Sequence, residues 1–267
     1  MNKIQIMGIL NVTPDSFYDG QGDQYLDNVD EYNRKLSQDL FKADIIDVGA
    51  ESTRPGSLKI SAKEEINRLS FIKDKISFLN HMKYSIDTYK YDVAKYALDN
   101  GFSMINDIYA GQYDDRIFKL CSDKNVPIVL MHMKGNPSNM QENTSYNSVI
   151  DDIMFFFKNR TEVAVKSGID RENIIIDPGI GFGKSFKDNY LIIKSIPKLK
   201  ELGFKILIGL SRKSFLDVDN KITPDKRLEE SIAMNAISAI NGADILRVHD
   251  VNATLKALKT VESYINC

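Results

Sequence analysis

The side chains of this chain that could do chemistry follow its short apolar runs, each at the C-terminal end of a run. They are Asn11, Asp47, Asp87, Asn106, Asp107, His132, Asp177, Ser211, Arg212, Lys213, Arg247 and His249. Carboxylates and amides accept hydrogen bonds from ring N–H and NH₂ groups, as on a guanidine-like edge. Cationic side chains bind phosphate oxygens. We therefore predict a site for a ligand that combines a donor-rich ring with an anionic tail.

The anion-binding half of this site would come from Arg54, Lys213, Arg247 and His249. Arg247 and His249 stand two positions apart in one apolar run, and such residues share a face of a strand. A guanidinium beside an imidazole forms an anion site, for example for a diphosphate.

Several of these residues also have a purely structural interpretation. An aspartate at the end of a strand often caps the next helix, and capping or loop bracing is favoured for Asp47 and Asp107. It is less favoured for Asp87 and for Asp177, which Pro-Gly follows. His132 is explained equally well as a histidine at the edge of the core.

The stretch IIIDPGIGFGKS at 174–185 ends like a phosphate-binding loop but does not satisfy the pattern of one. The pattern Gly-x-x-x-x-Gly-Lys-Ser/Thr places backbone N–H groups around the phosphates. Counting back from Gly183 puts Pro178 at the first glycine position, and proline has no N–H. We assign Lys184 and Ser185 to the start of the next helix and not to phosphate binding.

Eight short apolar runs would position the polar residues. They occupy 4–10, 45–49, 84–88, 104–108, 128–132, 174–178, 206–210 and 245–249. Each run is β-branched or Leu-rich without strict alternation, which is typical of strands buried on both faces.

Charged stretches with helical spacing separate these runs. Residues 90–100 would place one apolar face against the core, made by Val93, Ala94, Ala97 and Leu98. Residues 232–240 would do the same with Ile232, Ala236, Ile237 and Ile240. Glycines that suit a left-handed position after a helix stand at Gly101, Gly168, Gly203 and Gly242.

This alternation of strands and helices predicts an α/β protein, a single-domain (β/α)₈ TIM barrel over residues 1–267. The C-terminal ends of the strands of such a barrel meet at one mouth, where active sites lie. A doubly wound open sheet is the structural alternative. It usually shows a phosphate fingerprint after the first strand, and NVTPDSFYDG is not one.

The composition excludes several function classes. The formal net charge is −2, which makes nucleic acid an unfavourable main partner. The two cysteines, Cys121 and Cys267, have no metal-binding spacing and favour a reducing, cytoplasmic location. The N-terminal apolar run is too short and too polar for a membrane span.

Motifs along nearly the whole chain, from about residue 4 to residue 260, resemble those of the dihydropteroate synthases. They are MGILNVTPDSF, DVGAESTRPG, SIDTYK, INDI, VLMHMKGNP, DPGIGFGKS, LIGLSRKSF and RVHDV, in this order. Two small departures are FYDGQGD in the first loop and Ala50 in GAEST. The resemblance implies a transferase of folate biosynthesis, which sulfonamides inhibit. It would join 6-hydroxymethyl-7,8-dihydropterin diphosphate to 4-aminobenzoate.

The resemblance also implies roles for individual residues. The pterin ring would be bound by Asp87, Asn106, Met131, Asp177, Phe182 and Lys213. The diphosphate would be bound by Asn11, Thr53, Arg247 and His249, with Mg²⁺ on Asn11. The aminobenzoate slot would be lined by Thr53, Pro55, Phe182 and Ser214. The residues expected to act in catalysis are Asn11, Thr53, Lys213, Arg247 and His249.

The implied reaction is dissociative. Diphosphate leaves first, a pterin-stabilised cation forms at the methylene carbon, and the site stabilises the departing charge. A homodimer is also implied. Phe155 and Phe156 fall off the main apolar face of the predicted helix at 147–166 and could contact a partner.

Three other functions are compatible with parts of the pattern. A methyltetrahydrofolate-dependent corrinoid methyltransferase shares the pterin-binding barrel but has no use for a diphosphate site. The motifs that suit such a site, STRPG, SRK and RVH, argue against this function. A non-catalytic pterin-binding paralogue should lack part of the diphosphate set, which is complete here. A barrel aldolase would need a strand-end lysine in an apolar pocket.

We predict ordered binding from the composition of two loops, at 12–24 and 52–60. Both are polar and contain glycine, and they adjoin Asn11 and Thr53, so we expect them to close over bound diphosphate. The aminobenzoate slot would form only then. Calorimetry should detect clear 4-aminobenzoate binding with diphosphate and Mg²⁺ present and little without them. Equal affinity in the two conditions would show that the slot is already formed.

Overall fold

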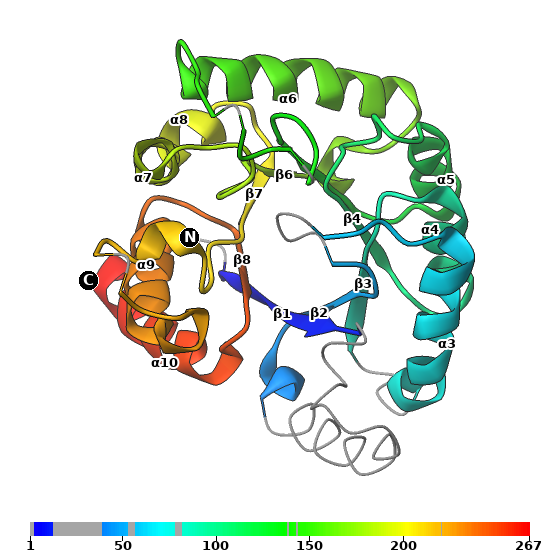
Figure 1. The fold of residues 1–267 in the computed structure, drawn as a ribbon, viewed down its shortest axis with the longest axis horizontal. Helices are drawn as coiled ribbons and strands as arrows, with labels where there is room; N and C mark the ends of the chain where they lie inside the picture. Colours follow the sequence, from blue (N-terminus) through cyan, green and yellow to red (C-terminus); the bar gives the residue numbers. More distant parts are fainter. Residues whose placement is uncertain are drawn as a thin grey trace.

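The computed structural model describes residues 3–12, 39–52, 57–77, 82–137, 139–142, 144–219 and 221–267. Most of the predicted closing loops, at 12–24 and 52–60, therefore lie outside the described residues, as do Thr53, Arg54 and Pro55. Strands and helices alternate around a closed ring (Figure 1).

The eight strands pair in chain order, all in parallel, and β1 pairs with β8 to close the barrel. Their bounds are β1 Gln5–Asn11, β2 Ile45–Gly49, β3 Lys83–Asp87, β4 Met104–Asp107, β5 Ile128–Met131, β6 Ile174–Asp177, β7 Lys205–Ile208 and β8 Ile245–Val248. Each lies within a residue or two of its predicted run. The predicted (β/α)₈ barrel is confirmed and the open sheet is wrong.

Helices surround the strands. The α-helices are α3 Ala62–Ser77, α4 Tyr91–Asp99, α5 Arg116–Lys124, α6 Val149–Lys166, α7 Phe186–Lys194, α8 Ile196–Lys200, α9 Leu228–Ile240 and α10 Val251–Ile265. Short 3₁₀ helices are η1 Leu40–Lys42, η2 Arg171–Asn173, η3 Ser214–Leu216 and η4 Pro224–Lys226. The four predicted cap glycines have φ between 77° and 101°, as a left-handed position requires.

The barrel interior has an apolar floor. It is made by inward side chains from seven strands, Met7, Ile45, Met104, Val129, Ile175, Leu207 and Ile245. Alternation along each strand turns the neighbouring residues outward. At Gly8, for example, an added Cβ would meet Leu40 and Val251 of the surrounding helices. The outward side chains form the larger core between strands and helices.

Helix α4 buries the face predicted for it, whereas α9 does not. In α9 the buried residues are Ser231, Asn235, Ser238 and Ala239. Ile237 and Ile240 are each 43% exposed, so the predicted apolar face is wrong. Small side chains let α9 approach the barrel closely: the Ser231 hydroxyl accepts the backbone N–H of Arg212 at 2.9 Å. Ile237 and Ile240 therefore lie on the outer surface of α9, whereas Ile232 and Ala236 are half-buried.

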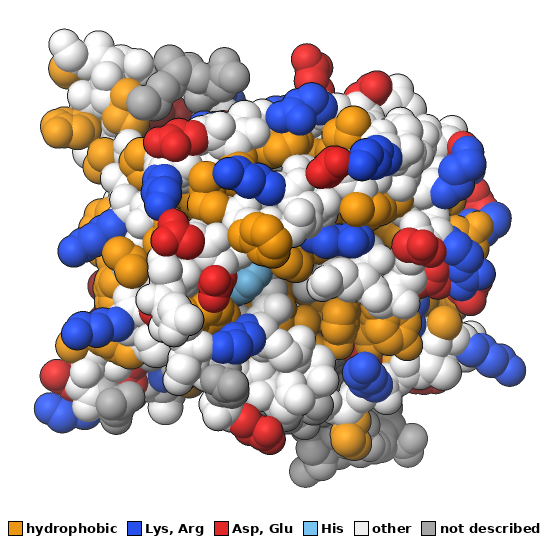
Figure 2. Space-filling model, turned by 90° about the horizontal axis from the view of Figure 1, so that it is seen from above, with side chains coloured by type: hydrophobic (Ala, Val, Ile, Leu, Met, Phe, Trp, Pro, Cys, Tyr) orange, Lys and Arg blue, Asp and Glu red, His pale blue; other side chains and the backbone are white. Residues whose placement is uncertain are grey.

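The surface carries charges of both signs. Figure 2 views the molecule from the side of α6 and shows hydrophobic side chains between scattered Lys, Arg, Asp and Glu. On α6, Phe155 is 69% exposed, while the ring of Phe156 packs against His132 with centroids 4.9 Å apart.

None of the helices in the described part of the chain combines the length and hydrophobicity that crossing a bilayer requires.

A buried ion triad fixes the segment that follows β2. The ammonium of Lys90 lies 2.7 Å from Glu51 and 2.7 Å from Glu65. Glu51 also accepts the backbone N–H of Ile60 at 3.1 Å. One cation therefore joins β2, α3 and the start of α4.

We expect Lys90→Met to destabilise the fold by about 3–5 kcal/mol, because two buried carboxylates would lose their shared counterion. Denaturant titration would measure this loss. Lys95→Met is the matched control on the same helix. Lys95 pairs with Asp99 on the surface, where its side chain is 52% exposed, so its removal should leave the stability close to that of wild type. Equal effects of the two substitutions would contradict a structural role for the triad.

Candidate functional site

The mouth of the barrel holds a layer of polar side chains directly above the apolar floor. Alternation places Asp47, Asn106, Asp177 and Arg247 two residues beyond floor positions on their strands, and Asp87 two residues beyond the buried Ser85 of β3. We call these five the polar layer. The structure brings Asp87, Asn106 and Asp177 of the predicted ring-binding set together there with Arg247 of the predicted anion-binding set.

Arg247 is the centre of this layer. Its Nε donates to Asp47 at 2.6 Å and its Nη2 donates to Asp87 at 2.7 Å. Asn106 donates from Nδ2 to the same Asp47 oxygen at 2.9 Å. The predicted capping role of Asp47 is therefore wrong, because its carboxylate binds side chains of β4 and β8 instead.

The charges of the layer perturb one another. Burial raises the pKa of Asp87 to about 7, with Arg247 opposing the shift and Asp47 adding to it. Burial alone would lower the pKa of Arg247, but Asp47 and Asp87 hold it above its ordinary value. One guanidinium is therefore shared between two buried carboxylates.

Asp177 ends β6 and binds the turn that follows it. Its Oδ1 accepts the backbone N–H of Gly179 at 2.8 Å. Its Oδ2 faces Gly209, the residue after β7, where an added Cβ would lie 4.0 Å from that oxygen. Burial raises the pKa of Asp177, and Lys213 opposes the shift. Asp177 thus has one oxygen committed to its turn and one directed toward the space that a small residue leaves.

Two lysines lie close to this turn. Lys213 donates to the carbonyl of Ile180, and its ammonium is 4.6 Å from the ring centroid of Phe182. Burial lowers the pKa of Lys213 to about 8, with Asp177 opposing. Lys184 is buried and donates to the carbonyl of His132 at 2.8 Å, and that it binds no phosphate stays a prediction. Burial lowers the pKa of Lys184 well below its ordinary value.

The predicted start of the helix after this turn is confirmed at Ser185. Its hydroxyl accepts the N–H of Asp188, whose carboxylate accepts the N–H of Ser185, which together form a capping box. The glycine-rich stretch therefore ends in a helix cap.

On the diphosphate side, His249 Nδ1 lies 3.1 Å from the Ser211 hydroxyl. Arg247 points toward β2 and β3, whereas His249 lies against the end of β7, so the two residues flank the β8 end. Asn11 lies beside Gly49, where an added Cβ would be 3.7 Å from its Oδ1 and 3.6 Å from Asp87 Oδ2. Glycine at this position leaves room between the two side chains.

Other predicted residues have structural roles or lie apart. Asp107 accepts the N–H groups of Tyr109 and Gly111 at 2.8 and 2.6 Å, which confirms loop bracing. Arg212 is no ligand of the mouth: it forms a two-point ion pair with Asp250 at 2.8 and 2.6 Å. Its φ of 58° places its backbone in the left-handed region.

Met131 and Phe182 belong to a small apolar cluster with Tyr89 and Ile108 beside the mouth. Ser214 is exposed at the start of η3. His132 is the core-edge histidine of the structural interpretation, because it is 6% exposed and packs outward against α6.

The described residues include no group of three or more His, Cys, Asp or Glu that could hold a metal ion.

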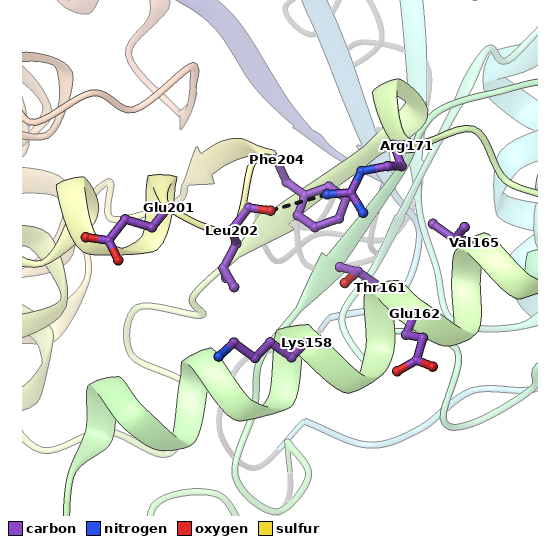
Figure 3. A pocket seen from close by; sticks show the side chains of 8 residues that line it. All are labelled: Lys158, Thr161, Glu162, Val165, Arg171, Glu201, Leu202 and Phe204. Carbon is purple, nitrogen blue, oxygen red and sulfur yellow. Dashed lines mark hydrogen bonds between the residues drawn. The ribbon is translucent and has the colours of Figure 1, made fainter.

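A surface groove of about 360 Å³ lies at the opposite end of the barrel, between α6 and residues 201–204 (Figure 3). The Arg171 guanidinium there donates to the carbonyl of Leu202 at 3.4 Å and lies 4.4 Å from the Phe204 ring centroid. Because this groove is remote from the polar layer, we do not assign the reaction to it.

Comparisons with known proteins agree with this geometry. Residues 7–249 match the family model of pterin binding enzymes. The dihydropteroate synthase of Bacillus subtilis is 37% identical over 99% of this chain and 90% of its own length. That of Escherichia coli K12 is 36% identical over 98% of this chain and 92% of its own.

Solved structures show the same fold. A Yersinia pestis dihydropteroate synthase in a sulfonamide drug complex superposes with a TM-score of 0.90 and 36% identity, covering 99% of this chain and 95% of that one. A Xanthomonas albilineans dihydropteroate synthase with 4-aminobenzoic acid gives a TM-score of 0.90 and 35% identity, covering 100% and 94%.

The burial of His132 predicts an acid sensitivity of the fold. Burial and Lys184 lower its pKa from 6.5 to about 2, so the unfolded chain binds the proton first as the pH falls. Stability should therefore be lost progressively below about pH 6.5, by about 2 kcal/mol at pH 5. His132→Phe, which keeps an aromatic ring against Phe156, should remove this part of the loss. Denaturant titrations at pH 7 and pH 5 would test it. Equal losses in both proteins would contradict the assignment.

Proposed function

This chain belongs to the dihydropteroate synthase family of pterin-binding enzymes, and we propose that the polar layer at the barrel mouth is its active site. The enzyme joins 6-hydroxymethyl-7,8-dihydropterin diphosphate to 4-aminobenzoate and releases 7,8-dihydropteroate and diphosphate. The observation that supports this site best is the set of acceptors above a dry apolar floor. Asp177 Oδ2 and the side chains of Asp87 and Asn106 can accept from the N–H and NH₂ groups of a pterin.

The ring would lie between the two sides of the mouth. Asp87, Asn106 and Asp177 bind its donor edge, and Lys213 lies over it from the β7 end. Met131 and Phe182 supply apolar contact beside the ring. Gly209, next to Asp177 and Arg247, leaves room for a flat group to approach them.

The reaction needs no nucleophilic side chain. The C–O bond to the diphosphate breaks with its electron pair on oxygen, and the cation that forms at the methylene carbon is stabilised by the pterin. The amine nitrogen of 4-aminobenzoate then bonds to that carbon and loses a proton. Arg247 and His249, with Thr53, stabilise the negative charge that develops on the leaving group.

Mg²⁺ is the proposed metal, with Asn11 as its protein ligand. The described residues hold no cluster of acidic or histidine ligands, and an amide oxygen stands at the mouth beside Gly49. This donor set fits Mg²⁺, which commonly takes one or two protein oxygens and completes its shell with phosphate oxygens and water. When bound, it neutralises charge on the leaving diphosphate.

The aminobenzoate slot is proposed between Phe182, Ser214 and residues Thr53 and Pro55, the last two outside the described residues. Sulfonamides would occupy the same slot, as the sulfonamide complex of the Yersinia pestis relative supports.

The free cysteines, Cys121 and Cys267, support the proposed cytoplasmic location. That residues 1–267 form a single domain stays a prediction.

A coupled assay for diphosphate release tests the function directly. Release should require both the pterin diphosphate and 4-aminobenzoate, and omitting either substrate should abolish product formation. Methyl transfer from methyltetrahydrofolate, with no diphosphate release, would favour the corrinoid methyltransferase instead. Pterin binding without turnover would favour the non-catalytic paralogue.

A homodimer is part of the proposal, and α9 is the surface that supports it. Ile237 and Ile240 are exposed on α9, and Leu191 of the neighbouring α7 is 46% exposed. Adjacent apolar side chains on two helices suit a two-fold interface. Ile237→Lys should therefore halve the mass measured by light scattering. The control Phe155→Lys, on α6, should leave it unchanged. The reverse result would place the contact on α6.

Asp177→Asn should separate binding from folding. Its amide oxygen can keep the bond to the Gly179 N–H, so the turn should survive and the melting temperature should stay within a few degrees. The NH₂ group then replaces Oδ2 and faces a pterin donor. Such a mismatch costs roughly 1–3 kcal/mol, so pterin affinity should fall at least about tenfold. Calorimetry and thermal melting on the one variant give both quantities. Lost stability with intact affinity would make Asp177 only a turn brace.

A further inference from the structure

Lys184 is a buried cation that the proposed reaction does not use. Its side chain is 4% exposed, and its ammonium donates to the backbone carbonyl of His132, the residue after β5, at 2.8 Å. His132 in turn donates its backbone N–H to the carbonyl of Asp177 at 2.9 Å. Burying an ammonium is costly unless nearby groups compensate its charge, so its position beside the end of β6 points to a negative partner there.

The turn that follows Asp177 packs directly against this ammonium. An added Cβ at Gly179 would lie 3.0 Å from Lys184 Nζ and 2.0 Å from the carbonyl oxygen of His132. The N–H of the same glycine donates to Asp177 Oδ1 at 2.8 Å. Lys184, the turn and one oxygen of Asp177 therefore lie in one closely packed group, in which position 179 has no room for a side chain.

Lys184 and Asp177 influence each other's charge without a direct ion pair between them among the described residues. Burial lowers the pKa of Lys184, and Asp177 is the main charge that opposes this shift. Burial raises the pKa of Asp177, and Lys184 is one of the charges that oppose that shift. The other titratable or charged groups that face the pair are Lys213, Arg247, Asp188 and His132. A cation that is bonded to a backbone carbonyl thus balances the carboxylate without covering Asp177 Oδ2.

We propose that Lys184 is a positioning residue for pterin binding, which holds the turn after β6 and keeps Asp177 anionic while Asp177 Oδ2 stays open to the ring. This inference rests on the proposed function, because the ring is taken to be a pterin. It gives a buried lysine an effect on a ligand that it does not touch.

Calorimetry with 6-hydroxymethylpterin, a probe without an anionic tail, tests the effect of the charge. Lys184→Met leaves burial less opposed, so Asp177 should take up a proton at a higher pH than in wild type. Protonation turns one of its acceptor oxygens into a donor. Pterin affinity should therefore fall, and the loss should grow from about pH 7.5 to about pH 5.5 until it reaches at least about tenfold. Diphosphate with Mg²⁺, which is proposed to bind the other side of the mouth, should keep its affinity.

Asp177→Asn supplies the background that isolates this effect. Its side chain does not titrate, so adding Lys184→Met to it should leave the pH dependence of pterin binding unchanged. Lys184→Gln keeps a donor for the His132 carbonyl without the charge. It should follow Lys184→Met, and it carries the test if the Met variant does not fold. Lys187→Met, at an exposed lysine of α7, is the matched control and should bind the pterin like wild type.

Four results would overturn the inference. A wild-type pH profile in Lys184→Met would remove any role of the lysine in binding, and a wild-type profile in Lys184→Gln would make it only a hydrogen-bonded brace of the turn. An equal change on adding Lys184→Met to Asp177→Asn would mean that it acts through another group. A parallel loss of diphosphate affinity would show general disruption of the mouth. A wild-type protein that binds no pterin would instead overturn the proposed function, and with it the inference that rests on it.

Discussion

The polar layer depends on one guanidinium that serves two buried carboxylates. Arg247 comes from β8, whereas Asp47 and Asp87 come from β2 and β3, separated from it by 200 and 160 residues. Two aspartates so close together inside a barrel would repel each other and lose their hydration without a shared cation. Only closure of the barrel through β1 and β8 brings that cation to them. Fold and site are therefore linked: the ring of strands must close before Arg247 can hold the two carboxylates of the mouth in place.

Much of the fold and part of the site could be predicted from local pattern. Short apolar runs locate all eight strands, because strands of a parallel barrel are buried on both faces. Strand alternation then puts residues such as Asp177 and Arg247 above the floor. Those features depend only on neighbouring positions in the chain, so they can be predicted from the sequence alone.

Features that depend on distant pairing could not be obtained in this way. The role of Asp47 requires knowing that Arg247 and Asn106 reach it. Helix α9 buries small and polar side chains such as Ser231 against the barrel. The spacing of apolar residues in the sequence does not predict which of these side chains are buried. Arg212 stands after a strand, where the sequence predicts ligand-binding residues. In the structure its backbone is left-handed and its side chain pairs with Asp250. Each of these outcomes is decided by a partner far away in the sequence.

The ion pair between Arg212 and Asp250 has a consequence for the local opening of the protein. It joins the loop after β7, which carries Lys213, to the turn after β8, which carries His249. Neither segment can detach without breaking a two-point, charge-assisted bond to the other. We therefore expect the two segments to open as one cooperative unit in amide hydrogen exchange, with shared protection. The proposed pterin side and the proposed diphosphate side of the mouth would then be lost and regained in a single event.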